Sequence, residues 1–250
     1  MLLKILNNQK ISRKRGDFGI EILFPGQALA TSDTEMGTIG RIDQAHVLSG
    51  TLIPMHPHRD DEILTYLRSG KVKHKDSEGF TDVISNQKLR LMNAGTTFYH
   101  EERVLEESDA LQGLQIFLRP QKSGLFPRVQ FYELSEVHSP NQWQILAGKK
   151  DNLPLQIRSS TWVYDMRLAN GVQQTLPKLP TENASCLLYV FDGEVLINNT
   201  TTLAKGESIF LENESIHFEA LQTSDLVLFV TDKTTEYTTN GMYSGNQNKN

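Results

Sequence analysis

Short apolar runs, many of them alternating with polar residues, cover most of the chain and are separated by Gly, Pro, Asn and Asp. A period of two residues is typical of strands with one buried face, and convincing helical patterns are few. The runs that predict strands most clearly are 18–24, 37–48, 62–67, 111–118, 161–168, 184–198 and 225–232. Short strands at this spacing predict an all-β protein built as an antiparallel sandwich or barrel.

The two halves of the chain repeat one pattern. EILTYLRSGKVKHKDSEG (62–79) resembles CLLYVFDGEVLINNTTTL (186–203), since each has an apolar strand, a glycine turn and a second strand. Two copies of one β unit would account for the length of the chain as two similar barrels. Strand alternation fades around ELSEVHSPNQWQ, so we expect a first domain of residues 1–135 and a second of residues 136–250.

The composition, with 38% hydrophobic and 22% charged residues, is that of an ordinary globular protein. Its net charge of −5 argues against a nucleic-acid surface, so the basic segment KISRKRG (10–16) is interpreted as a solvated strand end. No stretch approaches the roughly eighteen apolar residues of a membrane span, and the first apolar run is too short for a signal peptide. We expect a cytoplasmic protein that binds no membrane and no nucleic acid directly. The single cysteine, Cys186, lies in a strand-like run and predicts a buried, unreactive thiol.

Two histidines flank a proline in MHPHRDDEILTYL, which continues into an apolar strand. Side chains alternate between the faces of a strand, so His56 and His58 point the same way, about 7 Å apart along the chain. Such a pair alone is most often a surface feature. A second pair with the same spacing, His100 and Glu102, occurs in NAGTTFYHEERV. If both strands present these pairs to a barrel interior, three imidazoles and one carboxylate converge there.

This set of donor atoms suits one divalent transition metal ion. Neutral imidazoles supply nitrogen ligands, and the carboxylate cancels one positive charge. Four ligands on one side leave one or two coordination positions for water, substrate or dioxygen. Iron(II) is the first expectation, and manganese, nickel, copper and zinc stay open because most first-row ions accept these donors.

The remaining histidines show no comparable pattern. His46, His74 and His138 are isolated and are expected to be exposed, whereas His217 is expected to pack in a partly buried position. The polar segment 234–250 lacks an apolar pattern, and we expect it to fray unless it packs across the other barrel.

The segment HPHRDDEILTYLRSGKVKHKDSEG, followed by MNAGTTFYHEE and QGLQIFLRP, resembles the pirin-like proteins of the cupin superfamily over roughly residues 50–120. The resemblance implies a bicupin, with two jelly-roll-like β-barrels in tandem and one mononuclear metal site in the N-terminal barrel. By position, the family's metal ligands fall on His56, His58, His100 and Glu102. The second half offers no matching histidine pair, which implies a metal-free C-terminal barrel.

Glu62 falls where the wider cupin pattern places a carboxylate ligand. Strand alternation gives its side chain the inward direction of His56 and His58, and we expect it to hydrogen-bond a ligand histidine. An exposed acid in the RDDE run is the alternative. Phe98, on the same side of its strand as His100, is expected to narrow access to the metal.

The resemblance also implies an activity, because bacterial pirin-like proteins resemble quercetin 2,3-dioxygenases, which open a flavonol ring with dioxygen. In this interpretation Glu102 takes the hydroxyl proton as a general base. The slot for a small aromatic substrate is expected to be lined by Met55, Leu64, Met92 and Phe98. Two alternatives stay open: a non-enzymatic, iron- and redox-dependent regulator that binds a protein partner, and a binder with a vestigial site. Open access to the metal would favour catalysis, and a closed site would favour sensing.

Overall fold

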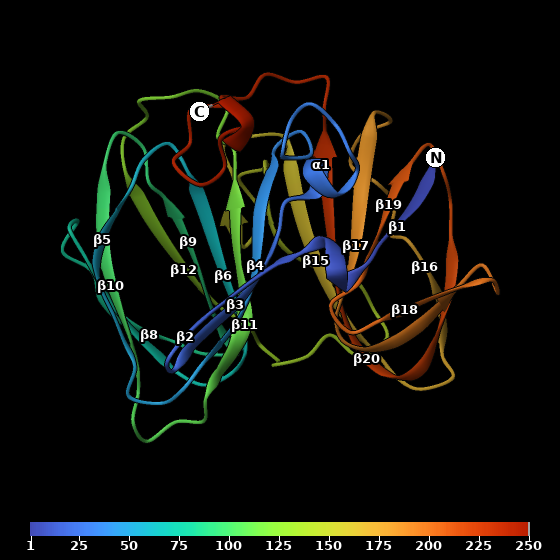
Figure 1. Cartoon of the computed structure of the whole chain (residues 1–250), viewed down its shortest axis with the longest axis horizontal. Coiled ribbons are helices and arrows are strands. Elements are labelled where there is room, and N and C mark those ends of the chain that lie inside the picture. The colour runs from blue at the N-terminus through green and yellow to red at the C-terminus, as the bar shows by residue number, and fades with distance from the viewer. Residues whose placement is uncertain (250) are drawn as a thin grey trace.

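The computed structural model describes residues 1–249 and shows two antiparallel β domains side by side, with nearly no helix (Figure 1). The first domain packs a seven-stranded sheet, in the order β12-β9-β6-β11-β4-β3-β2, against a four-stranded sheet, in the order β5-β10-β7-β8. Its strands are β2 (Ile11–Arg15), β3 (Phe18–Leu23), β4 (Ile39–Val47), β5 (Leu52–His58), β6 (Glu62–Ser69), β7 (Val72–Asp76), β8 (Thr81–Ile84), β9 (Lys88–Asn93), β10 (Phe98–Val104), β11 (Leu111–Leu118) and β12 (Arg128–Glu133).

The second domain is one nine-stranded sheet built around two long, paired strands, β17 and β20. Register shifts between Val190 and Val195 bend this pair. Gly193 has a φ of +94°, and a Cβ there would lie 2.3 Å from the Ser224 Oγ, so the bend requires glycine. The strands are β1 (Leu2–Ile5), β13 (Gln144–Gly148), β14 (Leu155–Gln156), β15 (Thr161–Leu168), β16 (Gln173–Thr175), β17 (Ala184–Ile197), β18 (Thr201–Ala204), β19 (Ser208–Glu212) and β20 (His217–Asp232).

Helical structure within residues 1–249 is confined to α1 (Pro25–Ala28) and the 3-10 turns η1 (Asn7–Gln9) and η2 (Gln247–Lys249). The prediction of an all-β chain with two β units is therefore confirmed. Among the described residues, no helix has the length and apolar character needed to cross a bilayer. Cys186 is buried in β17, and burial raises the pKa of its thiol to about 12, as expected for an unreactive cysteine.

The two domains share a hydrophobic core. Leu64 and Tyr66 of β6 and Leu114 of β11 are buried in one cluster with Leu187 of β17 and Phe229 of β20. One face of β6 therefore packs against the second domain, and only its other face is available to the interior of the first domain. This arrangement fixes the direction of every side chain on β6.

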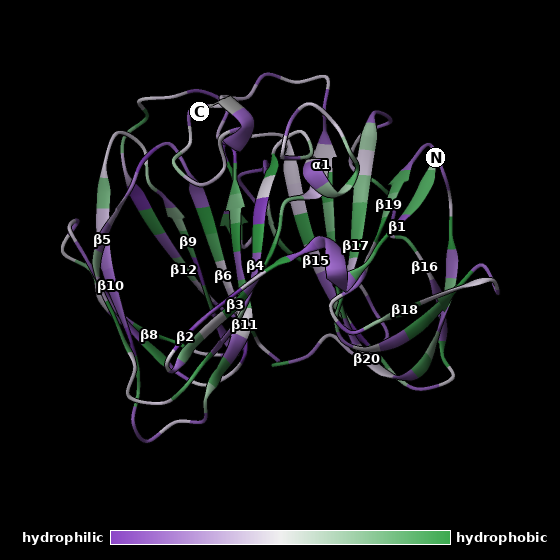
Figure 2. Ribbon diagram, in the orientation of Figure 1, coloured by the Kyte–Doolittle hydropathy of each residue, from purple (hydrophilic) through white to green (hydrophobic). Residues whose placement is uncertain are grey.

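The two ends of the chain cross to the opposite domain (Figure 1). Strand β1 pairs with β19 of the second domain, and Figure 2 shows both strands coloured as hydrophobic. The segment after β20 returns to the first domain, where the Ser244 backbone amide and hydroxyl donate to the Asp61 carboxylate. The boundary between residues 135 and 136 stays a prediction, and each domain is completed by a segment from beyond that boundary.

Candidate metal centre

Strands β5 and β10 bring three histidines together inside the first domain. The strands pair antiparallel, with His100 directly opposite His56. The ring centroids of His56 and His100 are 4.3 Å apart, and the ring centroid of His58 lies 4.9 Å from each of these two. One ligand atom from each ring lies within 4.8 Å of the others. The structure thus unites the three histidines that the sequence singled out.

The nitrogen positions fit a shared ion. The Nε2 atoms of His58 and His100 are 2.9 Å apart, which is about the spacing of two adjacent ligands at right angles with metal–nitrogen distances of roughly 2.0–2.1 Å. The Nδ1 atom of His56 lies 2.8 Å from the Pro54 carbonyl oxygen. Because a carbonyl only accepts, this Nδ1 carries a proton, and Nε2 is the ring nitrogen of His56 that is left to bind an ion.

His58 and His100 are also in the protonation state that a metal needs. Burial, reinforced by the charge of His56, lowers the pKa of His58 to about 3. Burial and the Arg90 guanidinium hold the pKa of His100 far below its ordinary value. The buried Nδ1 atoms of His58 and His100 have no hydrogen-bond partner among residues 1–249. A neutral imidazole has a lone pair on one ring nitrogen, here Nε2, so these two rings fit a divalent cation.

Glu102 faces the same interior but is held by an arginine. Its Oε1 accepts a hydrogen bond of 2.5 Å from Arg90 Nη2 and lies 3.8 Å from His100 Nδ1. The three histidines form a close group without this carboxylate. The direction predicted for Glu102 is therefore observed, and its role as a fourth ligand stays a prediction.

Arg90 is a site residue that sequence analysis missed. This fully buried side chain from β9 donates to Thr65 Oγ1 at 2.7 Å and lies 2.5 Å from His74 Nδ1. His74, Glu102 and His100 form a second group of potential metal ligands, but the Arg90 cation already bridges the first two. A metal ion is consequently expected among the three histidines first described, away from the guanidinium.

The expectation that His74 is exposed is wrong. Its ring is fully buried, and its Nε2 donates to Asp76 Oδ2 at 2.6 Å while Nδ1 accepts from Arg90. Burial and the Arg90 charge lower the pKa of His74 to about 4. Of the other histidines, His46 is exposed as expected, whereas His138 is half-buried against Arg167. His217 is exposed and not partly buried.

Comparison with known proteins identifies the family. The pirin model matches residues 27–118, and the model of the quercetinase C-terminal cupin domain matches residues 144–230. A Zymomonas mobilis protein, provisionally named a quercetin 2,3-dioxygenase, is 33% identical over 180 residues, which cover 71% of this chain and 75% of that protein. The chain belongs to the pirin family.

Other relatives of this pirin-family protein agree with the assignment. Quercetin 2,3-dioxygenase of Escherichia coli K12 is 26% identical over 174 residues, covering 70% of this chain and 74% of that enzyme. The crystal structure of YhhW from Escherichia coli, at 21% identity, has a TM-score of 0.78 and covers 94% of this chain and 100% of that one. The same protein in complex with nickel(II) gives 22% identity, a TM-score of 0.78 and coverage of 93% and 99%. The predicted fold of two cupin domains is confirmed.

Both expectations for Glu62 in this pirin-family protein are wrong. The carboxylate is 1% exposed, accepts hydrogen bonds from the Asn93 side chain and, at 2.9 Å, from the Arg158 backbone amide, and binds no histidine. Between β5 and β6 the chain turns through Asp60, whose φ is +52°. The turn resets the alternation of faces, so Glu62 points with Leu64 toward the second domain. Asp61 is the carboxylate nearest His58, with Oδ2 3.9 Å from Nδ1.

A cavity of about 270 Å³ opens onto His56, His58 and Glu102. Of the four residues expected to line it, Leu64 lies in the core between the domains and Met55 is exposed. Met92 and Phe98 are buried in a cluster with Phe117, and of these three only Phe117 lines the cavity. Phe98 thus shares the inward side of His100 but does not narrow the cavity. The side chains that line the cavity include Phe18, Ile20, Val47, Leu67, Phe117 and Tyr243.

Tyr243 comes from the polar C-terminal segment that was expected to fray. Over the described part of that segment this expectation is wrong, and the alternative of packing across the other barrel holds. Backbone amides and a backbone carbonyl of the C-terminal segment form hydrogen bonds with Arg59, Asp61 and Arg119 of the first domain. No local sequence signal marks these contacts, because they join residues more than a hundred positions apart.

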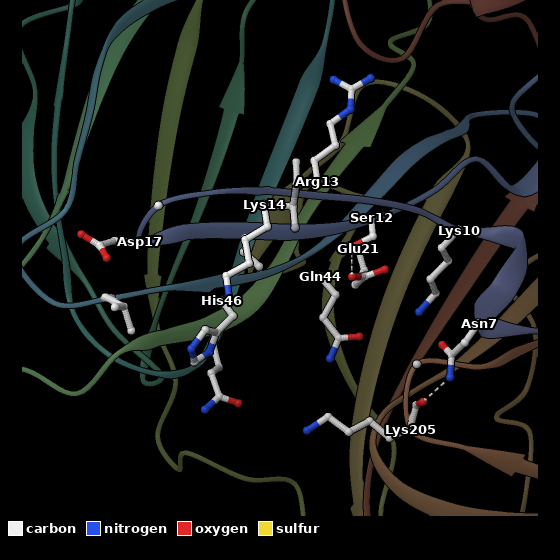
Figure 3. A pocket seen from close by; sticks show the side chains of 17 residues that line it. Asn7, Lys10, Ser12, Arg13, Lys14, Asp17, Glu21, Gln44, His46 and Lys205 are labelled. Atoms are coloured by element: carbon white, nitrogen blue, oxygen red, sulfur yellow. Dashed lines mark hydrogen bonds between the residues drawn. The ribbon is translucent and has the colours of Figure 1, made fainter.

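A larger groove of about 760 Å³ lies apart from the histidine cluster (Figure 3). Figure 3 shows Lys10, Gln44 and Lys205 around it, and the Lys10 ammonium donates to the Tyr189 hydroxyl at 2.9 Å. The groove contains none of the three clustered histidines. The smaller cavity is the candidate site because the metal-ligating chemistry lies there.

Proposed function

We propose that this pirin-family protein is a metal-dependent dioxygenase that opens the ring of a flavonol or a related planar aromatic. The observation that supports this best is the convergence of His56, His58 and His100, with the last two held neutral by burial, at a cavity that also contains Glu102. A relative in Escherichia coli carries the name quercetin 2,3-dioxygenase, and nickel(II) is bound in the crystal structure of YhhW. Both facts concern those proteins and support the same proposal here.

His56, His58 and His100 would hold the ion, with iron(II) as the first candidate and manganese, nickel, copper and zinc as alternatives. When bound, such an ion lowers the pKa of an aromatic hydroxyl and makes the ring electron-rich toward dioxygen. The protein supplies imidazole donors that are held in place by burial and, at His56, by the hydrogen bond to the Pro54 carbonyl oxygen. Fixed donors keep the geometry of the site independent of the substrate.

Glu102 is the proton acceptor in this proposal. Its Oε1 is held by Arg90, which fixes the position of the carboxylate, and Oε2 is assigned to take the hydroxyl proton of a substrate in the cavity. Phe117 and Tyr243 offer aromatic walls for a flat ring, and Val47 and Leu67 exclude water. These roles need a substrate that is planar, aromatic and weakly acidic.

The alternative is a non-enzymatic regulator, in which the oxidation state of iron controls the binding of a protein partner. A cavity that gives a small molecule access to His56 and His58 supports catalysis over sensing. Binding of a partner that follows iron oxidation in a protein without turnover would favour the regulator.

The test is aerobic turnover of quercetin by protein loaded separately with iron(II), manganese, nickel, copper or zinc. Loss of flavonol absorbance and dioxygen uptake are measured together with the metal content. We expect His58→Ala and His100→Ala to lower turnover more than about a hundredfold, beyond the effect typical of outer-shell residues. His46→Ala removes an exposed histidine outside the site and should leave both turnover and metal content unchanged. No turnover at full occupancy with every metal would refute the activity on this substrate.

A further inference from the structure

The C-terminal segment that follows β20 lies outside both regions matched by the family models, residues 27–118 and 144–230. It nevertheless contributes to the cavity of the first domain through Tyr243. In Figure 1 this red segment leaves the second domain and passes over one end of the first. A wall of the candidate active site is thus supplied by a part of the chain that neither matched domain contains.

The segment is firmly attached at this point. The Asp61 carboxylate accepts hydrogen bonds from the Ser244 backbone amide at 2.8 Å and from its hydroxyl at 2.7 Å, and from the Tyr243 amide at 3.2 Å. Arg119 Nε donates to the Ser244 carbonyl at 2.7 Å. Asp61, Arg119 and Ser244 are fully buried. Buried charged partners on both sides of one residue fix the backbone of its neighbour, Tyr243.

The Tyr243 ring lies directly beside the histidine cluster. Its centroid is 5.2 Å from the His58 ring and 5.2 Å from the Phe117 ring. The Arg41 guanidinium carbon lies 5.3 Å from the centroids of both Tyr243 and Phe117. Arg41 is itself held by Asp43, so its position is fixed. Two aromatic rings and one cation therefore surround the approach to His58.

We propose that Tyr243 is a specificity-determining residue, which sets the width of the cavity and packs against the planar ring of an aromatic substrate. This inference rests on the proposed function for the class of substrate. The cavity of about 270 Å³ is small for a ligand site, since typical sites have volumes of about 300–1,000 Å³. Removal of one aromatic side chain from its wall therefore changes which molecules fit. An aromatic contact also contributes to affinity through stacking, even without turnover.

The experiment measures binding of quercetin and of a bulkier benzyloxy derivative to zinc-loaded protein by fluorescence quenching. Tyr243→Ala should raise the Kd for quercetin about five- to tenfold through the lost stacking contact. It should also lower the Kd for the benzyloxy derivative, because the cavity is wider. Tyr243→Phe keeps the ring and should bind quercetin within about twofold of the unmodified protein. Met242→Ala is the matched control, since this neighbouring side chain is exposed and lies outside the cavity lining.

Two results would overturn the inference. One is a Tyr243→Ala protein with the same relative affinity for the two ligands as the unmodified protein. The other is an equal change in Met242→Ala, which would point to a general loosening of the segment. Binding that depends on Tyr243 without turnover by any metal form refutes the proposed reaction and keeps this inference. Turnover with affinities unaffected by Tyr243→Ala refutes this inference and keeps the reaction.

Discussion

Arg90 changes the chemistry of the site more than any other single residue. A guanidinium buried between His74 and Glu102 neutralises the one carboxylate that the sequence assigned to the metal. Without a partner, a charge at this depth would lose several kcal/mol of solvation. Removal of either partner therefore leaves the other charge buried and unpaired. The ion pair also determines how far the Glu102 carboxylate can move toward the histidines.

Replacement of this arginine gives the first further prediction. Arg90→Met leaves the Glu102 carboxylate buried and unpaired, so metal-free protein should lose about 3–5 kcal/mol of unfolding free energy. Adding Glu102→Gln to Arg90→Met removes the unpaired charge and should restore part of the loss. Urea unfolding of the two single variants and the double variant measures the coupling. Additive losses in the double variant would contradict the pairing.

The side-chain directions of residues on regular strands could be predicted from the alternation of faces. The roles of residues that follow a turn, or that lie on a strand buried on both faces, could not be predicted. His56, His58, His100 and Glu102 follow simple alternation, so the sequence alone placed them in one interior. Arg90 was missed because β9 is buried on both faces, and an arginine in such a strand has no signal of its own.

At the scale of elements, the pairing of β5 with β10 creates the site and the C-terminal segment closes it. The register shift opposite His100 and Glu102 places its extra residue on β5, and the pairing of β10 with β7 stays regular there, so both side chains on β10 keep the inward direction. The C-terminal segment was unpredictable, since its anchor joins Asp61 to Ser244 across 183 positions of sequence. Long-range hydrogen bonds of a polar segment produce no hydrophobic periodicity in the sequence from which they could be predicted.

Truncation after Thr238 tests the importance of this segment. The Asp61 side chain loses the hydrogen bonds from Tyr243 and Ser244, so the unfolding free energy should fall by at least about 2 kcal/mol. Asp61→Ala should then cost less in the truncated chain than in the full chain, because those donors are already gone. Denaturant unfolding of the four proteins measures this difference. Equal costs of Asp61→Ala in both chains would contradict the anchoring role.

At the scale of the whole molecule, the two domains behave as one packed unit. They share the core that contains Leu64 and Phe229. In addition, the Glu62 carboxylate of β6 accepts a hydrogen bond from the backbone amide of Arg158 in the second domain. Burial raises the pKa of Glu62 to about 7, despite the hydrogen bonds that it accepts from Arg158 and Asn93. The contact between the domains is therefore sensitive to pH.

The direction of this pH dependence follows from the raised pKa. Between the unfolded value of roughly 4.3 and the folded value near 7, the folded protein holds a proton that the unfolded chain has lost. The stabilising contribution of the protonated group is complete below the unfolded pKa and is lost as the pH rises through the folded pKa. Glu35 and Asp61 also have raised pKa values and contribute to both proteins, so between pH 4.5 and 8 the unfolding free energy should fall by roughly 1–3 kcal/mol more in the unmodified protein than in Glu62→Gln. Glu136→Gln, at an exposed acid, should keep the loss, and the same loss in Glu62→Gln would exclude this origin.

The crossing of the chain ends has a consequence for how the protein is made. The ribosome completes the strands that carry His56 and His100 early, but Tyr243 emerges only after the entire second domain. During that interval the cavity lacks the wall that Tyr243 supplies beside His58. An ion that binds the three histidines would therefore meet the cavity without this wall until the C-terminal segment has been translated.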